Sequence, residues 1–212
     1  DGKVDFVGIG RELLCEPQWP NKAKAGDRHF PKCIGCNACF ERIGKSLPLR
    51  CAINPLAGRE KHVPEPVCRP ECVAVVGAGP GGITAAVTAK RRGHQVELFE
   101  ETGEVGGQLI LAAAPPRKDK IYDYIAYLKE ELAQSQVTVH LNRRFTVDDA
   151  ADFDHIIIAA GAQSRQMTVE GAETFTKTAW DVLAEPADSF RGRHVIVVGG
   201  GNIGQALVNY TN

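Results

Sequence analysis

Four cysteines in one short stretch constrain this chain more than any other feature of its sequence. They stand in a C-x2-C-x2-C-x11-C spacing, at Cys33, Cys36, Cys39 and Cys51. A cubane iron–sulfur cluster takes one thiolate per iron. Two-residue gaps let three thiolates converge from one tight loop, in which Gly35 eases the bend of the backbone, and a distant fourth thiolate closes the cage. The spacing therefore predicts a four-iron cluster at these residues.

Two other interpretations of the cysteines stay open. A structural zinc site usually takes two separated pairs of thiolates, which three crowded cysteines and one distant cysteine fit less well. Unrelated free thiols are the second alternative, although four of the seven cysteines fall between positions 33 and 51.

Composition sets limits on the partners of the chain. Its 212 residues carry a formal net charge of −1, so no basic excess points to nucleic acid or to an acidic membrane surface. No apolar run is long enough to cross a bilayer, and the first residues lack signal-peptide character. A cysteine-rich cofactor site suits a reducing cytoplasm. Because the chain lacks an initiator Met, we expect it to start inside a longer protein.

Residues 1–32 resemble the tail of another domain. Residues 4–11 predict a short buried strand that ends at Gly10 and Arg11, where a guanidinium could hold a phosphate or form a surface ion pair. Such a strand must join a sheet whose other strands are not in this segment. Cys15 is expected to be a small buried apolar residue. Residues 52–72, rich in proline and charge, predict a linker in which the remaining two cysteines are ordinary thiols.

The next segment carries a nucleotide-binding pattern. An apolar strand at 73–76 precedes a glycine-rich turn and a helix over 80–92, and a second strand at 95–99 ends at Glu100. The turn is expected to bind a pyrophosphate at the helix N-terminus, and Glu100 the ribose hydroxyls. The turn residues concerned are Gly77, Ala78, Gly79, Pro80 and Gly82.

A second glycine loop follows directly after this acid. Gly106, Gly107 and Gln108 in this position favour a flavin dinucleotide over a nicotinamide one. Apolar residues then recur at helical spacing over 121–132, and strands are expected at 137–141 and 155–160, the latter followed by Gly161.

The glycine pattern occurs again near residue 200. A strand is expected at 195–198, then a turn at Gly199, Gly201 and Gly204, then a helix from Asn202 or Ile203. Two such motifs predict two nucleotides, FAD at the first and a nicotinamide dinucleotide at the second. The position that separates NADH from NADPH would fall beyond residue 212, so the choice stays open.

Together these motifs resemble the 2,4-dienoyl-CoA reductase and trimethylamine dehydrogenase type of flavin oxidoreductase, within the old yellow enzyme superfamily. The most specific part is the cysteine run between a barrel end and a flavin motif. The resemblance rests on Gly10-Arg11, residues 16–20, residues 33–39, Cys51 with Asn54-Pro55, residues 75–82, residues 106–108 and the second glycine motif.

The resemblance implies an α/β chain of four parts. Residues 1–32 would end an FMN-binding TIM barrel, with Arg11 at the FMN phosphate, and 33–72 would hold the 4Fe-4S cluster. Residues 73–165 would be the first part of a Rossmann-like FAD-binding domain, and 166–212 would begin the NAD(P)-binding domain.

The activity implied is an electron relay from NAD(P)H through FAD, the cluster and FMN to an activated C=C bond of a small-molecule substrate. The catalytic acid would lie outside this chain, as would the remaining barrel and the C-terminal parts. We therefore expect the chain alone to bind some cluster but no stoichiometric FMN, and not to catalyse substrate reduction. A homo-oligomer is compatible with this.

Two further functions are kept as alternatives. In one, ADP occupies the first nucleotide site of an electron-transfer module in an amine dehydrogenase. In the other, the chain resembles an electron-input subunit of glutamate synthase, against which the barrel-end residues Trp19-Pro20 argue.

Overall fold

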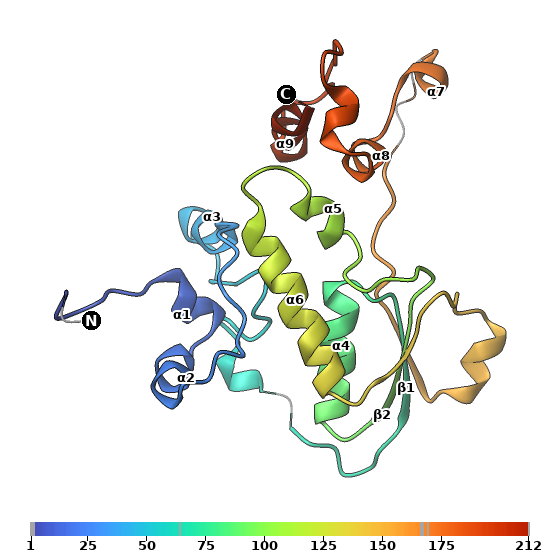
Figure 1. Cartoon of the computed structure of the whole chain (residues 1–212). Helices are drawn as coiled ribbons and strands as arrows, with labels where there is room; N and C mark the ends of the chain where they lie inside the picture. The colour runs from blue at the N-terminus through green and yellow to red at the C-terminus, as the bar shows by residue number, and fades with distance from the viewer. Residues whose placement is uncertain (1–2, 64, 166–167, 169, 212) are drawn as a thin grey trace. The chain divides into compact units, whose positions relative to one another are not determined.

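The computed structural model of the chain describes residues 3–63, 65–165, 168 and 170–211. The chain divides into two compact units, residues 1–68 and residues 69–212 (Figure 1). Each is described by itself.

The first unit is built from short helices around the cysteine stretch. They are α1 (Arg11–Cys15), α2 (Trp19–Ala25), α3 (Ala38–Gly44) and the 3-10 turn η1 (Glu60–His62). Helix α1 ends at Cys15, two residues before Pro17, and Pro20 lies in the first turn of α2. Gly26 ends α2 in the left-handed conformation, with φ of 72°.

The strand expected over residues 4–11 is wrong for this chain. The described residues of the first unit contain no strand, and Phe6 is 94% exposed. A strand needs neighbours for its backbone N–H and C=O groups. The described part of this unit supplies none, so the apolar pattern of Val4, Phe6 and Val7 finds no sheet to join.

The second unit contains a four-stranded parallel sheet. Its strands are β1 (Cys72–Val76), β2 (Gln95–Phe99), β3 (Thr138–His140) and β4 (His155–Ile158), in the order β3-β2-β1-β4. Each lies within two residues of the bounds predicted from sequence. The predicted α/β class is confirmed.

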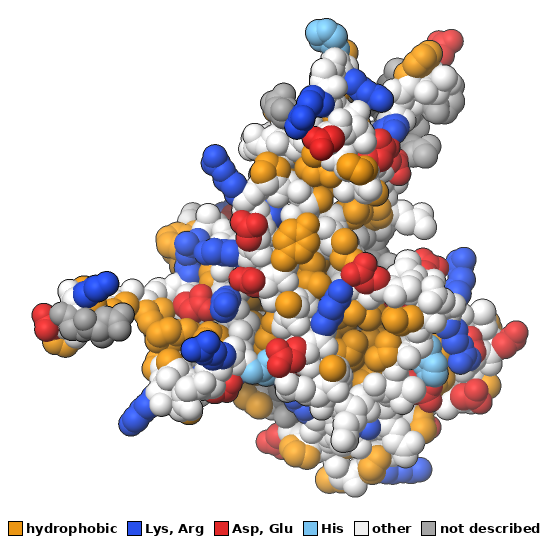
Figure 2. Space-filling model, viewed as in Figure 1, with side chains coloured by type: hydrophobic (Ala, Val, Ile, Leu, Met, Phe, Trp, Pro, Cys, Tyr) orange, Lys and Arg blue, Asp and Glu red, His pale blue; other side chains and the backbone are white. Residues whose placement is uncertain are grey.

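Three helices connect the strands. Helix α4 (Pro80–Arg91) packs on β1 and β2, and α6 (Asp119–Gln134) packs on α4 and on the short helix α5 (Leu109–Ala113). Apolar side chains gather along the seam between α4 and the strands (Figure 2). Glu131 of α6, which is 8% exposed, forms an ion pair with Arg91 of α4 at 2.6 Å.

Aromatic side chains pack on the face of the sheet to which Phe99 points. The Phe99 ring contacts those of Phe145 and Phe153 edge-on, and stacks on His140 at 4.7 Å between centroids. The segment that supplies these rings contains the 3-10 turn η2 (Asp148–Asp152) and connects β3 to β4.

The regular secondary structure described between residues 170 and 211 is helical. It contains α7 (Ala172–Phe175), α8 (Ala179–Ala184), η3 (Ala187–Phe190) and α9 (Asn202–Thr211). Helix α9 begins where the sequence predicts. The strand expected at 195–198 is wrong for this chain, because no described strand lies alongside it, and Ile196 is 89% exposed. Among the residues described, no helix has both the length and the apolarity needed to cross a bilayer.

Candidate cofactor sites

The first glycine turn joins β1 to α4 and is closed by backbone contacts. Gly77 has φ of 102°, and a Cβ there would lie 2.5 Å from the carbonyl oxygen of Ala159. A Cβ on Gly82 would lie 1.8 Å from the carbonyl oxygen of Gly77. A Cβ on Gly79, by contrast, would meet nothing within 4 Å. The backbone is therefore closely packed at Gly77 and Gly82 and leaves open space at Gly79. A pyrophosphate needs such open space to approach the turn.

The second glycine loop packs against this turn. The N–H of Gly106 donates to the carbonyl oxygen of Ala78 at 2.8 Å. A Cβ on Gly107 would lie 2.9 Å from the Cα of Gly79. The side-chain amide of Gln108 donates to the carbonyl oxygen of Ala162 at 2.8 Å, just beyond β4. The two glycine segments thus meet at the carboxyl edge of the sheet, where ligands of open α/β sheets bind.

Glu100 lies at the end of β2 and is 9% exposed. Its Oε2 accepts the N–H of Ala78 at 2.8 Å, and its Oε1 accepts the N–H and hydroxyl of Thr102 at 2.9 and 2.8 Å. Burial raises the pKa of this carboxyl, but these three hydrogen bonds outweigh burial and hold its pKa below the usual range. These bonds use three of the roughly four acceptor positions of a carboxylate, so Oε2 keeps one position for a ribose hydroxyl.

The second glycine turn has the geometry of the first. Gly199 has φ of 113°, and a Cβ on Gly204 would lie 1.9 Å from the carbonyl oxygen of Gly199. A Cβ on Gly201 would meet nothing within 4 Å, as at Gly79. Both turns are therefore closed at the last glycine and open at the middle one.

The four cysteines of the predicted cluster line one cavity in the first unit, together with Arg11, Leu14 and Asn37. Gly35 has φ of 71°, as expected for the bend in the loop. Cys39 lies in the first turn of α3, a helix that the sequence analysis did not anticipate. Within the described residues, no three His, Cys, Asp or Glu side chains are arranged to hold a single metal ion. A cavity with one thiol per iron is the donor set that a four-iron cluster needs.

Donors from the end of α1 and from the loop that follows Cys51 surround its sulfur. The Cys15 thiol and the backbone N–H groups of Ala52, Ile53 and Asn54 donate to its sulfur and lower the pKa of Cys51 to about 6. Asn54 also ties this loop to α1, because its side-chain amide donates to the carbonyl oxygen of Leu14 at 2.9 Å.

Cys15 is a residue whose role the sequence did not reveal. It is buried as expected, at 2% exposure, but its thiol also donates to the carbonyl oxygen of Pro31 at 3.2 Å, just before the cysteine loop. Its hydrogen bond to Cys51, and then its burial, raise the pKa of the Cys15 thiol. No local pattern signals the contact, because Cys15 stands outside the cysteine spacing.

Gly10 and Arg11 lie at the start of α1. The guanidinium of Arg11 donates to the side-chain oxygen of Asn37 and lies 6.0 Å from the centroid of the Phe40 ring. Arg11 therefore contacts the cysteine loop. Its predicted contact with an FMN phosphate stays a prediction.

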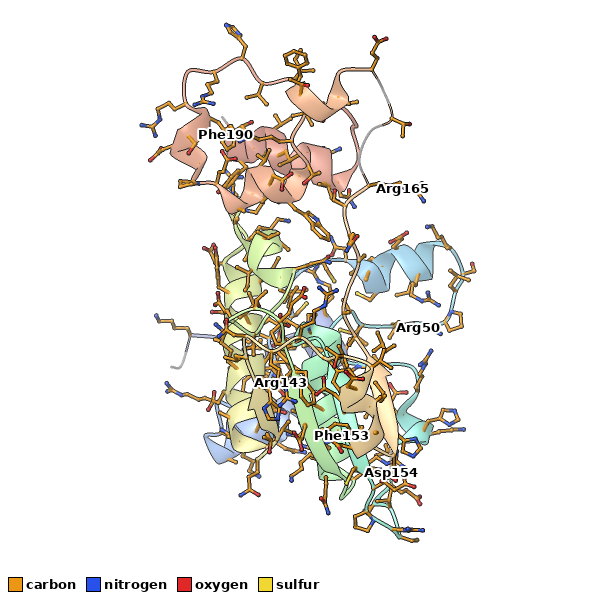
Figure 3. All side chains as sticks on the ribbon, turned by 90° about the vertical axis from the view of Figure 1, so that its right-hand side faces the viewer. Arg50, Arg143, Phe153, Asp154, Arg165 and Phe190 are labelled. Carbon is orange, nitrogen blue, oxygen red and sulfur yellow. The ribbon has the colours of Figure 1, made fainter. Side chains whose placement is uncertain are left out.

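A depression of about 190 Å³ beside the sheet was also not anticipated. It is lined by Glu97, Phe99, Asp152 and Phe153, among others, and by Arg143, whose guanidinium lies 5.1 Å from the Phe99 centroid. Arg143 and Phe153 are labelled in Figure 3. Arg143 is paired with Asp149 at 2.8 Å, so this cation already has a partner.

Two glycine turns of one geometry, each opening a helix, and an acid held against the first turn define a dinucleotide-binding protein. The chain belongs to the pyridine nucleotide-disulphide oxidoreductase family, whose model matches residues 72–209.

Similarity extends through the cysteine segment as well. The chain is 40% identical to an NADH oxidase of Thermoanaerobacter brockii, over 99% of this chain and 34% of the oxidase. It is 33% identical to a cinnamate reductase of Clostridium sporogenes, over 96% of this chain and 31% of the reductase. The chain thus spans about a third of the length of these relatives.

Solved structures agree with these relatives. A 2-naphthoyl-CoA reductase in complex with 2-naphthoyl-CoA matches 99% of this chain and 33% of its own, with a TM-score of 0.85 and 25% identity. A 6-hydroxypseudooxynicotine amine oxidase from Pseudomonas geniculata N1 matches 85% of this chain and 30% of its own, with a TM-score of 0.76 and 31% identity. The predicted resemblance to flavin oxidoreductases of this type is confirmed.

Proposed function

We propose that this chain is the electron-input part of an NAD(P)H-dependent flavin and iron–sulfur enzyme that reduces an activated C=C bond. When bound, FAD, a 4Fe-4S cluster and FMN would carry electrons from NAD(P)H to that bond, one at a time where the cluster takes part. The residues of the chain hold, orient and tune these groups.

The observation that carries the proposal is the repeated turn geometry at Gly82 and Gly204. In each turn the last glycine lets helix and strand backbones meet, and the middle glycine leaves room for a phosphate group. An enzyme that passes electrons from NAD(P)H to FAD binds two dinucleotides, and it therefore needs two such turns. Glu100 and the loop at Gly107 and Gln108 accompany the first turn and support FAD there, and we assign the nicotinamide dinucleotide to the second turn.

The cysteine cavity supports the cluster. Cys33, Cys36, Cys39 and Cys51 all face one cavity, and the sulfur of Cys51 is already surrounded by donors that favour its thiolate form. A thiolate is the form that binds iron. FMN would be bound chiefly by parts of the protein outside this chain, with Arg11 as the contact that this chain supplies.

The class of substrate is argued from the relatives. Relatives named cinnamate reductase and 2-naphthoyl-CoA reductase support a substrate with unsaturation conjugated to a carboxylate or a thioester. The amine oxidase supports the alternative, an electron-transfer module of an amine dehydrogenase, in which ADP would occupy the first turn.

The experiment is an anaerobic titration of the full-length protein with NADH and with NADPH, while flavin absorbance and iron with acid-labile sulfide are measured. We expect one nucleotide to bleach the flavin, and the protein to contain iron and sulfide. No bleaching by either nucleotide would favour the ADP alternative.

A variant separates the cluster from the nucleotide sites. Cys36→Ser should lose iron and sulfide but keep FAD, whereas Cys68→Ala, which removes an exposed thiol outside the cavity, should keep both. Zinc without sulfide in the unsubstituted protein would refute the relay.

A further inference from the structure

Glu12 lies in the first turn of α1, and its side chain contacts the cysteine loop. Its Oε2 accepts the backbone N–H of Cys33, the first cysteine of the predicted cluster, at 3.0 Å. The two residues are 21 positions apart in the sequence, so this bond joins α1 to the start of the cysteine loop. Glu12 does not line the cavity itself, and it therefore acts on the ligand set through Cys33.

The second oxygen of this carboxylate is buried without a donor. Among the residues that the structure describes, no group forms a hydrogen bond with Oε1 of Glu12. The guanidinium of the neighbouring residue Arg11 is directed elsewhere, because it donates to the side-chain oxygen of Asn37 and lies 6.0 Å from the centroid of the Phe40 ring. A buried acceptor without a donor costs free energy, so its retention beside a proposed iron ligand calls for an explanation.

A negative charge in this place acts on a cluster bound at the four cysteines. The Glu12 carboxylate contacts the backbone of Cys33, whose sulfur would bind iron. Reduction adds negative charge to a cluster, and a partly buried negative charge nearby opposes it, since the protein screens charge less than water does. The carboxylate also occupies the N–H of Cys33, which then cannot donate to a cluster sulfur and stabilise the reduced state. Both effects favour the oxidised cluster.

We propose that Glu12 is a positioning residue that fixes the backbone N–H of Cys33 and, through its negative charge, lowers the reduction potential of the cluster bound there. This inference rests on the proposed function. Groups around the ligands of a metal site tune the metal through charge and hydrogen bonding, and Glu12 supplies both at the first ligand of the set.

The test uses the full-length protein purified anaerobically. Glu12→Gln removes the charge and keeps a side-chain oxygen for the Cys33 N–H, whereas Glu12→Asp keeps the charge on a shorter side chain. Glu60→Gln is the matched control, because Glu60 is an exposed acid of the same unit that also accepts a backbone N–H, that of Gly58 at 2.8 Å. Iron and acid-labile sulfide are measured first. The cluster is then titrated with dithionite and redox dyes, and its reduced form is followed by low-temperature electron paramagnetic resonance.

We expect Glu12→Gln to keep its iron and its cluster to be about tenfold easier to reduce, a shift of ~59 mV to higher potential at ~59 mV per tenfold for one electron. Glu12→Asp should show less than half of that shift, and the control none. If Glu12→Asp alone loses iron, the comparison of Glu12→Gln with the control still decides the inference.

An unchanged or lower potential in Glu12→Gln would overturn the inference and leave the proposed function intact. An equal shift in Glu12→Asp would overturn it as well, because that variant keeps the charge. Loss of iron in Glu12→Gln would do the same, since Glu12 would then serve the assembly of the site and not its potential. Absence of iron from the unsubstituted protein would instead refute the cluster, and with it the proposed function.

Discussion

The backbone N–H of Ala78 donates to Oε2 of Glu100 at 2.8 Å, so the acid at the end of β2 holds the glycine turn at the end of β1. The other carboxylate oxygen binds Thr102, in the segment that leads to the second glycine loop. Glu100 therefore holds the first glycine turn in place without a bound ligand, so it contributes to folding stability apart from its proposed role in binding a ribose.

This contribution depends on pH. Because the folded-state pKa of Glu100 is depressed, its stabilisation is present above the ordinary value of 4.5 and is lost as the pH falls through the folded-state pKa. We expect Glu100→Gln to lower the free energy of unfolding by about 2 kcal/mol near neutral pH, and by much less in acid. Urea denaturation at several pH values measures this. Glu101→Gln, an exposed neighbour, is the control, and an equal loss at every pH would contradict the assignment.

Substitution by alanine should affect two neighbouring glycines of α4 very differently. Gly82→Ala places a Cβ against the Gly77 carbonyl and should cost about 3 kcal/mol or more, with loss of FAD, because backbone must move. Gly81→Ala meets nothing within 4 Å and should be neutral, or stabilising by up to about 1 kcal/mol. Thermal unfolding and flavin content check both variants. Similar losses in the two variants would refute the close approach at Gly82.

The same comparison at the second turn tests the division between the two nucleotides. In the full-length protein, Gly204→Ala should weaken NAD(P)H binding at least tenfold while flavin content stays unchanged, since its Cβ would meet the Gly199 carbonyl. Gly200→Ala, with open space at its Cβ, should bind normally. Rapid mixing with NADH or NADPH measures the affinity. If Gly204→Ala lost its flavin and kept its affinity for NAD(P)H, the second turn would be the flavin site instead.

The ion pair between Arg91 and Glu131 links α4 to α6. Arg91 is largely exposed whereas Glu131 is nearly buried. We therefore expect Arg91→Met to lower the free energy of unfolding by about 1 kcal/mol, and the unfolding free energy of this variant to depend less on salt concentration. Lys90→Met, on the same helical turn, serves as the comparison. Unfolding in low and high salt distinguishes the two variants, and identical salt dependence would argue against the pair.

Sequence reasoning succeeded where structure is encoded locally. The sequence predicts to within a residue or two the turn at Gly77, the helix that follows it and the strand that leads to Glu100. The signals for these elements, which are apolar runs, glycines and helical spacing, are all close together in the sequence. The capping box of α8, with Thr178 and Asp181 three positions apart, was an available signal that was overlooked.

It failed where an element depends on distant partners. Residues 4–11 and 195–198 have the apolar pattern of strands, but a strand forms only beside another one. The contact between Cys15 and Pro31 joins segments 16 residues apart in sequence, and a pattern search centred on regular cysteine spacing has no means of finding it.

The turn at Gly199 has consequences for how a protein of this kind reaches its native state. It closes against Gly204 even though residues 195–198 have no strand beside them in the described part of the chain. Its formation therefore requires only contacts a few residues apart, which form early and rapidly during folding. A turn of this kind is therefore complete before strands that are far apart in the sequence have paired.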